Sequence, residues 1–172
     1  AVAFTAGCGG EKKSDKKVLK VGMECAYAPY NWSQTKADGG AVKIAGSNEY
    51  AYGYDVMMAK KLADSMGADL EIHKIEWDGL APAVVSGKID AAIAGMSITS
   101  KRKETVDFTK PYYYATVVAL VKKDSEQAKA QSVADLKGSV ATSQLNTIWY
   151  DQIDQVPDVK KLPAIDTVPG MI

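Results

Sequence analysis

The fold class is decided by the run Ile89-Asp90-Ala91-Ala92-Ile93-Ala94, which leads into Gly95-Met96-Ser97-Ile98-Thr99. A short and almost continuous apolar run of this kind is typical of a strand that is buried on both faces, as strands are in parallel sheets. The glycine and hydroxyl residues that follow are typical of the loop in which such a strand ends. We therefore expect an α/β fold built around a parallel sheet.

The chain before this run alternates between strand and helix patterns. Residues 18–22 and 70–75 predict two strands, because apolar residues dominate the first and alternate along the second. Tyr54–Met66 predicts a helix, since its apolar residues recur at helical spacing and Gly67 follows as a stop signal. Leu80–Val85 predicts another helix, with a proline in its first turn. The order strand, helix, strand, helix, strand is that of an α/β unit with a parallel sheet.

The remainder of the chain predicts a loop and the beginning of a second lobe. Residues 31–53 are rich in Gly, Asn, Ser and Asp and predict a long loop. Residues 117–121, Val-Val-Ala-Leu-Val, predict a strand, and residues 139–142 and 146–153 predict another strand followed by a helix. Because a further helix starts within residues 169–172, we expect one complete lobe and an incomplete second lobe.

The composition excludes several classes of function. The 172 residues are 47% hydrophobic and 24% charged, as in an ordinary globular protein. Basic and acidic residues number 21 each, so we expect no nucleic-acid surface, which needs a basic excess. From residue 18 onward, charged residues interrupt every apolar run before it reaches the roughly 20 residues that span a bilayer. One His and two Cys are too few for a zinc site of His and Cys ligands, and we expect neither a metal nor a cofactor.

The N-terminus has the features of a secretion signal. Residues 1–7 are apolar and end in small residues, and Ala6-Gly7-Cys8 resembles the lipobox of bacterial lipoproteins, in which the Cys thiol takes a diacylglycerol. Thr5 stands where those proteins usually carry an aliphatic residue. Residues 9–17 are polar and charged and predict a flexible tether. We expect residues 1–17 to be a signal remnant, lipobox and tether with Cys8 lipidated, and a frayed terminus with an unmodified Cys is the alternative.

Two aromatic segments follow predicted strands, at the place where open α/β sheets bind their ligands. Glu24-Cys-Ala-Tyr-Ala-Pro-Tyr-Asn-Trp32 comes directly after the first strand. Its rings can stack on a ligand and exclude water, or they can pack in the core, and for Tyr30 and Trp32 we give both readings equal weight. Trp77 follows the next strand and can form the opposite wall of a cleft, although a lone Trp more often serves packing.

The residues after the quoted run place three cations at the start of a helix. Thr99 or Ser100 can cap this helix. Its first turn then holds Lys101, Arg102 and Lys103, where the helix macrodipole disfavours each positive charge by roughly 0.3–1 kcal/mol. An anionic ligand would resolve the conflict, because free backbone N–H groups and the Arg102 guanidinium can together bind a carboxylate. Three solvated surface cations are the alternative.

Several segments together resemble the family 3 solute-binding proteins of bacterial ABC transporters, which bind polar amino acids. They occur in the family's order and spacing, and they cover nearly everything from residue 18 to residue 145. The segments are Tyr27-Ala-Pro-Tyr30, Gly53-Tyr-Asp55-Val56, Trp77-Asp-Gly-Leu80, Ser86-Gly-Lys-Ile-Asp90, Gly95-Met-Ser-Ile-Thr99, Lys101-Arg102 and Val106-Asp-Phe-Thr-Lys-Pro-Tyr112.

The resemblance implies a periplasmic-binding-protein-like fold of type II, in which two α/β lobes close on the ligand about a hinge. Residues 18–115 would form lobe 1, residues 116–122 a crossover strand, and residues 123–172 a part of lobe 2. It also implies an extracytoplasmic protein, which we expect to be a monomer anchored to the membrane through Cys8. Its partners would be a small amino acid and the permease subunits of an ABC transporter.

The resemblance also assigns roles in the ligand site. Arg102 resembles the residue that binds the ligand α-carboxylate, assisted by the backbone N–H of Ser97. Gly95 resembles the position whose carbonyl accepts from the α-ammonium. Glu24 falls where an acid often lies near the ligand side chain, which would suit Lys or Arg. The other expected ligand-binding residues are Tyr27 and Trp77 as aromatic walls, Met96 between Gly95 and Ser97, and Thr147 as the second-lobe contact, where Leu145-Asn146-Thr147 replaces the usual Gly-Thr-Thr.

An enzyme is the competing function, since dehydratases that act on prephenate or arogenate resemble this same family. Such chemistry needs a proton donor, for which Glu24 is the cleft-side candidate. A Ser-His-Asp triad would need His73, whose alternating run favours an outward-facing strand residue. Binding needs only a cation, N–H groups and rings. We therefore expect a binding protein and not an enzyme, with a sensor domain of a larger receptor as a third alternative.

Overall fold

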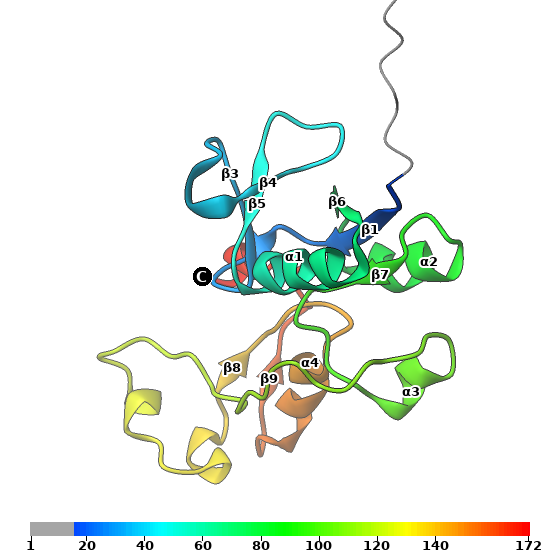
Figure 1. Ribbon diagram of the computed structural model, residues 1–172. Helices are drawn as coiled ribbons and strands as arrows, with labels where there is room; N and C mark the ends of the chain where they lie inside the picture. Colours follow the sequence, from blue (N-terminus) through cyan, green and yellow to red (C-terminus); the bar gives the residue numbers. More distant parts are fainter. Residues whose placement is uncertain (1–15) are drawn as a thin grey trace, which may run out of the picture.

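A computed structural model describes residues 16–172 of the chain (Figure 1). The predicted signal remnant and the lipidation at Cys8 lie outside the described residues. The strands are β1 (Val18–Met23), β2 (Ala26–Tyr27), β3 (Asn31–Gln34), β4 (Val42–Lys43), β5 (Tyr50–Tyr52), β6 (Asp69–Lys74), β7 (Ala91–Ala92), β8 (Val140–Ala141) and β9 (Lys160–Lys161). The helices are α1 (Tyr54–Met66), α2 (Leu80–Val85), α3 (Ser100–Lys103) and α4 (Ile148–Gln152), with 3-10 helices η1 (Asp38–Gly40), η2 (Trp77–Gly79), η3 (Glu126–Lys129), η4 (Val133–Leu136), η5 (Ile153–Gln155) and η6 (Pro169–Met171).

Three of the predicted strands assemble into a parallel sheet. β1 lies in the middle, with β6 on one side and β7 on the other. Val21 of β1 is paired with Ile72 of β6 and with Ala91 of β7. The predicted parallel α/β unit is confirmed, although β7 is shorter than the apolar run that predicts it. The loops after these parallel strands leave the sheet at one edge, which is where α/β proteins bind their ligands.

The core of this unit lies between the parallel sheet and α1. Val21 and Ile72 of the sheet are fully buried, and so are Val56 and Ala59 of α1. The two α1 side chains lie on one helical face, because residues three apart in a helix point the same way. The helix ends as predicted, since Gly67 takes a left-handed φ of 62° and its N–H closes the last turn.

Residues 31–53 contain β3, β4 and β5, which form an antiparallel sheet with β2, so the prediction of one long loop is wrong. The sheet has the order β2-β3-β5-β4. Trp32 of β3 pairs with Tyr52 of β5, and their rings meet edge to face with centroids 5.0 Å apart. Trp32 therefore serves packing, which was one of its two readings. The alternation around the fully buried Ala51 is a strand signal, but the polar, glycine-rich turns around it favour a loop.

Gly53 joins this antiparallel sheet to α1 at a point where no side chain fits. Its φ is 127°, and a Cβ at this position would collide with the main-chain carbonyl of Tyr30. The same carbonyl accepts a hydrogen bond of 2.8 Å from the N–H of Asp55. The turn that carries Tyr30 is thereby held against the start of α1, and glycine is required for the approach.

We expect Gly53→Ala to destabilise the protein by roughly 2 kcal/mol or more, because it adds a backbone collision to an unfavourable φ. Gly67→Ala is the matched control, since Gly67 also has a positive φ but nothing lies within 4 Å of its added Cβ. We expect the control to cost about 1 kcal/mol. Urea unfolding followed by circular dichroism measures both losses, and equal values would show that the approach to Tyr30 imposes no constraint.

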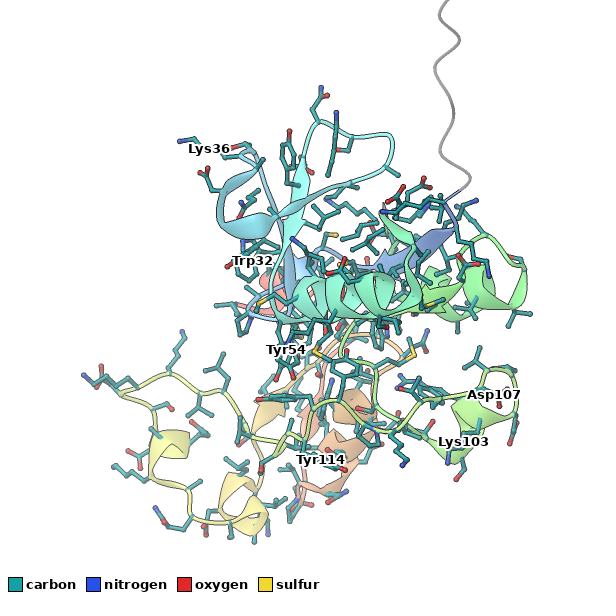
Figure 2. All side chains as sticks on the ribbon, in the orientation of Figure 1. Trp32, Lys36, Tyr54, Lys103, Asp107 and Tyr114 are labelled. Atoms are coloured by element: carbon teal, nitrogen blue, oxygen red, sulfur yellow. The ribbon has the colours of Figure 1, made fainter. Side chains whose placement is uncertain are left out.

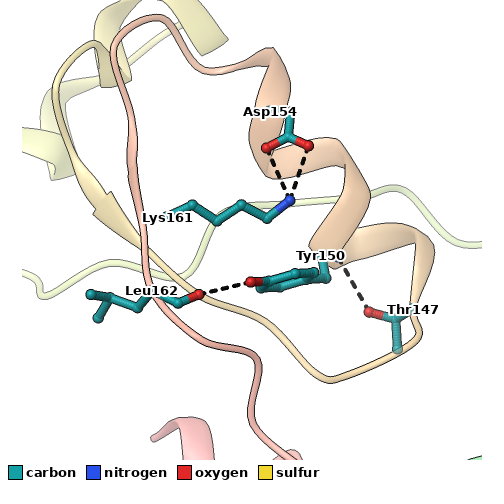
Figure 3. Close-up of polar contacts among 5 residues, drawn as sticks. All are labelled: Thr147, Tyr150, Asp154, Lys161 and Leu162. Atoms are coloured by element: carbon teal, nitrogen blue, oxygen red, sulfur yellow. Dashed lines mark hydrogen bonds and ion pairs between the residues drawn. The ribbon is translucent and has the colours of Figure 1, made fainter.

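The pair β8-β9 with α4 forms a second body, called the second lobe below (Figure 3). Lys161 of β9 bonds to Asp154 at 2.9 and 3.0 Å, and its ammonium lies 4.1 Å from the centroid of the Tyr150 ring. The Tyr150 hydroxyl donates to the carbonyl of Leu162 at 2.9 Å. Thr147 caps α4 by accepting from the N–H of Tyr150. The predicted strand and helix are confirmed, and the contacts of Tyr150 and Asp154 hold α4 and η5 against β9.

The connection into the second lobe differs from the prediction. Residues 116–122, predicted as a crossover strand, form no strand, and Val118 and Leu120 are 81% and 80% exposed. A strand needs a neighbour that shares its backbone hydrogen bonds, and none of the strands within residues 16–172 pairs with this segment. Its Val-rich composition favours an extended conformation, but a sheet forms only where a second strand pairs with it.

Candidate ligand-binding site

The candidate site lies where the parallel sheet faces the second lobe. Glu24 directly follows β1, Trp77 begins η2 after β6, and Gly95 comes shortly after β7. In Figure 1, this sheet lies with α1 and α2 in an upper layer, while α3, α4, β8 and β9 lie below it. Because carboxyl ends of parallel strands meet at one edge of a sheet, loops that are distant in sequence come together there.

α3 carries Arg102 and is a single turn. The hydroxyl of Thr99 caps it by accepting from the N–H of Arg102 at 3.2 Å, as one of the two predicted caps requires. In so short a helix the first turn is also the last, so the conflict between the three cations and the macrodipole, inferred from the sequence, does not arise. The contact of Arg102 with a ligand carboxylate stays a prediction. Lys101 and Lys103 are exposed, as solvated cations are, and Figure 2 shows Lys103 on the outside of the molecule.

The half-buried Arg102 guanidinium faces Trp77 and the second lobe. Its central carbon lies 5.4 Å from the centroid of the Trp77 ring, in a cation–π arrangement. Nη1 donates to the carbonyl of Ser97 at 2.7 Å, and Nη2 donates to the carbonyl of Asn146 at 3.0 Å. Burial lowers the pKa of Arg102, and the charge of Asp151 partly offsets this. The structure thus joins Arg102 and Trp77, and the carbonyl of Ser97 accepts from Arg102. The predicted contact of the Ser97 N–H with a ligand carboxylate stays a prediction.

Asn146 connects the second lobe to this pair. Its carbonyl also accepts from the indole N–H of Trp77 at 3.4 Å, and its side-chain amide donates to Asp78 at 2.9 Å. Its φ of 54° lies in the left-handed region, which Asn tolerates better than most residues. The sequence analysis did not predict this contact. The tolerance of Asn for left-handed backbone is the signal in the sequence that could have indicated a special conformation at residue 146.

Thr147 makes its side-chain contacts within the second lobe. The residue is 3% exposed. Its hydroxyl donates to the carbonyl of Gln144 at 2.6 Å and accepts from the N–H of Tyr150 at 3.3 Å. Both functions of the hydroxyl are therefore engaged in shaping its own loop. The contact of Thr147 with a ligand carboxylate stays a prediction.

Glu24 is a buried carboxyl at the boundary between the lobes. It is 4% exposed, and one of its oxygens accepts at 2.9 Å from the amide of Gln144, 120 residues further along the chain. Burial raises the pKa of Glu24, the Gln144 hydrogen bond lowers it, and the charge of Glu76 raises it. Gln144 also donates to the carbonyl of Asp166 at 3.0 Å, so its amide is fixed on both sides. The sequence contains no local signal for this pair.

A buried network centred on Asp55 supports the site, and sequence reasoning missed it. Asp55 accepts from the amide of Asn31 and from the hydroxyl of Tyr112, both at 2.7 Å. The Tyr112 hydroxyl in turn accepts from the N–H of Gly95 at 3.1 Å, and its carbonyl accepts from the hydroxyl of Tyr54 at 3.1 Å. Burial raises the pKa of Asp55, while its bonds to Tyr112 and Asn31 lower it. Figure 2 shows Tyr54 at the boundary between the two layers.

Two cavities adjoin these residues. The larger, of about 310 Å³, is walled by aromatic rings, among them Tyr27 and Tyr30, whose centroids lie 4.9 Å apart. Its lining includes four of the predicted residues, namely Tyr27, Gly95, Met96 and Ser97. A smaller cavity of about 210 Å³ is lined by Trp77, Leu145 and three acidic residues, Glu76, Asp78 and Asp166. Of the predicted ligand residues, these four thus line the aromatic cavity and Trp77 lines the acidic one, while Glu24, Arg102 and Thr147 line neither. Arg102 is stacked on the Trp77 ring.

Residues 19–161 match the bacterial extracellular solute-binding proteins, family 3. The chain belongs to this family. Among curated relatives, the arginine-binding extracellular protein ArtP of Bacillus subtilis (strain 168) is 34% identical over 87% of this chain and 53% of its own length. The octopine-binding periplasmic protein of Rhizobium meliloti is 33% identical over 80% of this chain and 41% of its own length. This family 3 chain spans about half the length of the curated relatives it matches.

Solved structures confirm the predicted fold of this family 3 chain. The arginine-bound form of truncated ArgBP from T. maritima shares 29% identity and a TM-score of 0.72, over 90% of this chain and 66% of that one. The ancestral amino acid-binding protein AncCDT-1, a precursor of cyclohexadienyl dehydratase, shares 31% identity and a TM-score of 0.74, over 90% and 63%. The fold is the type II periplasmic-binding-protein architecture, a mixed α/β lobe followed by a part of a second lobe.

Within residues 16–172, the family 3 chain offers no cluster of His, Cys, Asp or Glu suited to a metal ion. The same residues contain no helix with the length and apolar character that crossing a bilayer requires. Cys25 is buried, and burial raises the pKa of its thiol to about 12, so it is a poor nucleophile at neutral pH. His73 lies in β6 and contacts Glu71 at 2.7 Å. The strand position predicted for His73 is confirmed.

We expect Glu24→Gln to stabilise the protein at neutral pH. Because burial raises the pKa of Glu24, the contribution of this carboxyl to stability is greatest at a pH below its ordinary pKa of 4.5. The contribution falls as the pH rises through the raised pKa, because the buried carboxyl then ionises. Gln keeps an acceptor for Gln144 and removes the charge. The melting temperature should therefore rise by roughly 1–3 °C at pH 7 and match wild type near pH 4.

The matched control for this experiment is Glu104→Gln, which changes an exposed carboxyl on the loop after α3. Its melting temperature should equal that of the wild type at both pH values. Thermal unfolding at pH 4 and pH 7 measures all three proteins. A Glu24→Gln difference of the same size at both values would mean that the charge is not its cause.

Proposed function

We propose that this protein captures an amino acid with a cationic side chain between its two lobes and delivers it to the permease of an ABC transporter. The observation that carries the proposal is the half-buried guanidinium of Arg102, stacked on Trp77 at the boundary between the lobes. Family membership supports the solute-binding role.

Arg102 supports recognition of the ligand α-carboxylate. Its two terminal nitrogens donate to the neutral carbonyls of Ser97 and Asn146. A carboxylate is a stronger acceptor than a carbonyl, and its two oxygens fit the two parallel N–H groups of a guanidinium. Partial burial keeps water from competing and strengthens such a pair. The amino acid would therefore replace neutral acceptors by a charged one.

Glu24 supports a cationic ligand side chain. Burial disfavours its ionised form, as its raised pKa records. A guanidinium or ammonium group beside it would stabilise the ionised form and gain an ion pair that water screens little. The acidic lining of the smaller cavity favours a cation in the same region. The arginine-binding extracellular protein ArtP, a relative of this chain, agrees with this ligand class.

A dehydratase is the second candidate, favoured by the likeness to AncCDT-1 and by a buried carboxyl with a raised pKa. The AncCDT-1 structure is nevertheless described as an amino acid-binding protein, and so are the arginine-binding relatives. We therefore propose that this protein is not an enzyme. Incubation with prephenate or arogenate followed by chromatography separates the two, and product formation would reverse the assignment.

The proposed location is outside the cytoplasm, in keeping with the extracellular family. We propose that a diacylglycerol on Cys8 anchors the protein to the membrane, with residues 9–17 as a tether, and that it acts as a monomer. Such an anchor keeps the binding lobe close to the permease. Globomycin treatment and mass spectrometry of the N-terminal peptide test the anchor, and gel filtration tests the monomer.

We expect Arg102→Ala to weaken binding of L-arginine by roughly 30-fold or more, because one partner of a desolvated charge pair is lost. Arg102→Lys should recover only a part, since a lysine cannot bind a carboxylate bidentately. Lys103→Ala is the matched control, an exposed cation of the same helix, and it should bind as wild type does. Isothermal titration calorimetry measures all four proteins, and unchanged affinity of Arg102→Ala would remove the carboxylate assignment.

We expect Glu24→Gln to weaken binding of L-arginine and L-lysine more than binding of L-glutamine. The first two ligands lose a buried ion pair, whereas the neutral amide of glutamine loses only a hydrogen bond to a charged acceptor. A difference of roughly tenfold between the two classes corresponds to about 1.4 kcal/mol. Calorimetry with the three amino acids measures it, and equal losses would take away the argument for a cationic side chain.

A further inference from the structure

Gln144 and Glu24 form a buried pair across the boundary between the lobes. Each residue is 4% exposed, and the amide nitrogen of Gln144 donates to one oxygen of Glu24 at 2.9 Å. The same nitrogen donates to the carbonyl of Asp166 at 3.0 Å, and residues 144 and 165 form a parallel bridge. Because a side-chain amide has two N–H groups, both are used, and the direction of the donor is set by the second lobe.

The second oxygen of Glu24 is accessible to a further partner. Within residues 16–172, the Glu24 carboxyl accepts its hydrogen bond from Gln144 alone, through the first oxygen. Among the same residues, the Ser139 hydroxyl is the only enclosed polar side-chain atom without a hydrogen-bond partner, so the second oxygen of Glu24 is not enclosed. A carboxylate has about four lone-pair sites, and a cation can bind at those that remain.

We propose that Gln144 is a positioning residue that selects a cationic ligand side chain: it fixes one oxygen of Glu24 so that the other oxygen meets the cation. The inference rests on the proposed function, because it concerns the same amino-acid site. A hydrogen-bond donor favours the ionised form of a carboxyl, and burial opposes that form. Without the Gln144 donor, Glu24 would remain a neutral acid up to a higher pH, and a neutral acid forms no ion pair with a cation.

The groups around Glu24 make its charge depend on this hydrogen bond. Burial raises the pKa of Glu24, the Gln144 hydrogen bond lowers it, and the charge of Glu76 raises it. Tyr27 and Cys25 also face Glu24, but burial raises the pKa of both, so they stay neutral below pH 8. Of the described neighbours that act on the pKa of Glu24, Gln144 is therefore the one that favours the carboxylate.

Gln144→Met tests the proposal, because methionine has a similar length but no N–H donor. We expect L-arginine to bind roughly tenfold more weakly at pH 6, and L-glutamine by less than about twofold, since the neutral ligand needs no charge on Glu24. The affinity for L-arginine should fall as the pH is lowered from 8 to 5, with its midpoint at a higher pH in the variant. Calorimetry measures both ligands across this range. Unchanged affinity, equal losses for the two ligands, or an unchanged midpoint would overturn the proposal.

Gln155→Met is the matched control, the same change at an exposed glutamine of η5 in the second lobe. Its affinities and its midpoint should equal those of the wild type. A double variant adds a stricter test, because Gln144 acts through Glu24. Adding Gln144→Met to Glu24→Gln should leave the ratio of L-arginine to L-glutamine affinity unchanged. A further fall of this ratio would show that Gln144 acts independently of Glu24, against the proposal.

A measurement without ligand separates this inference from the proposed function. Carbon-13 nuclear magnetic resonance follows the titration of the Glu24 carboxyl, whose signal is assigned by its loss in Glu24→Gln. The titration midpoint should lie at a higher pH in Gln144→Met than in the wild type, and equal midpoints contradict the inference. If the wild type does not bind L-arginine, the proposed ligand fails, and the titration alone decides whether Gln144 controls Glu24. Should Gln144→Met fold poorly, Gln144→Asn, whose amide is one methylene shorter, carries the same test with a shift in the same direction.

Discussion

The arrangement of the site depends on one buried carboxylate. Asp55 is fully buried at the start of α1 and accepts from Asn31 and Tyr112, both at 2.7 Å. Removing such partners would leave a charge in a low dielectric at a cost of several kcal/mol, so all three elements are held at one point. Tyr112 extends the constraint by accepting from the N–H of Gly95. The loop that carries Ser97 and Arg102 starts there, and its direction is therefore set by Asp55.

Elements with local signals are predictable from the sequence, and elements that depend on distant partners are not. α1 follows from the spacing of its apolar residues and from Gly67, and its bounds agree with the structure. The antiparallel sheet was missed because its strands are short and separated by glycine-rich turns. The prediction of a strand at residues 117–121 is wrong for the opposite reason. The segment has a high β propensity, but a strand also needs a pairing neighbour, which the sequence does not reveal.

The same division holds within the candidate site. The sequence picks out Trp77 and Arg102 as individual residues, since each follows a predicted strand of the parallel sheet. It does not predict their stacking at 5.4 Å, nor that Arg102 meets the carbonyl of Asn146. The bond between Glu24 and Gln144 joins residues 120 positions apart, and nothing near either residue signals the other. Such contacts follow from how the second lobe docks on the first, which is a property of the whole fold.

Arg102 and Glu24, at the two ends of the site, have the same kind of partner. Arg102 meets the carbonyl of Asn146, and Glu24 meets the amide of Gln144, so the half-buried guanidinium and the buried carboxyl each have a neutral partner from the second lobe. A charged partner would hold each group so firmly that a ligand could gain little by replacing it. A neutral partner satisfies the desolvated group at lower strength. Under the proposed function, an amino acid with a cationic side chain binds favourably at both ends of the site. Its carboxylate is a stronger acceptor for Arg102 than the Asn146 carbonyl, and its cation is a stronger partner for Glu24 than the Gln144 amide.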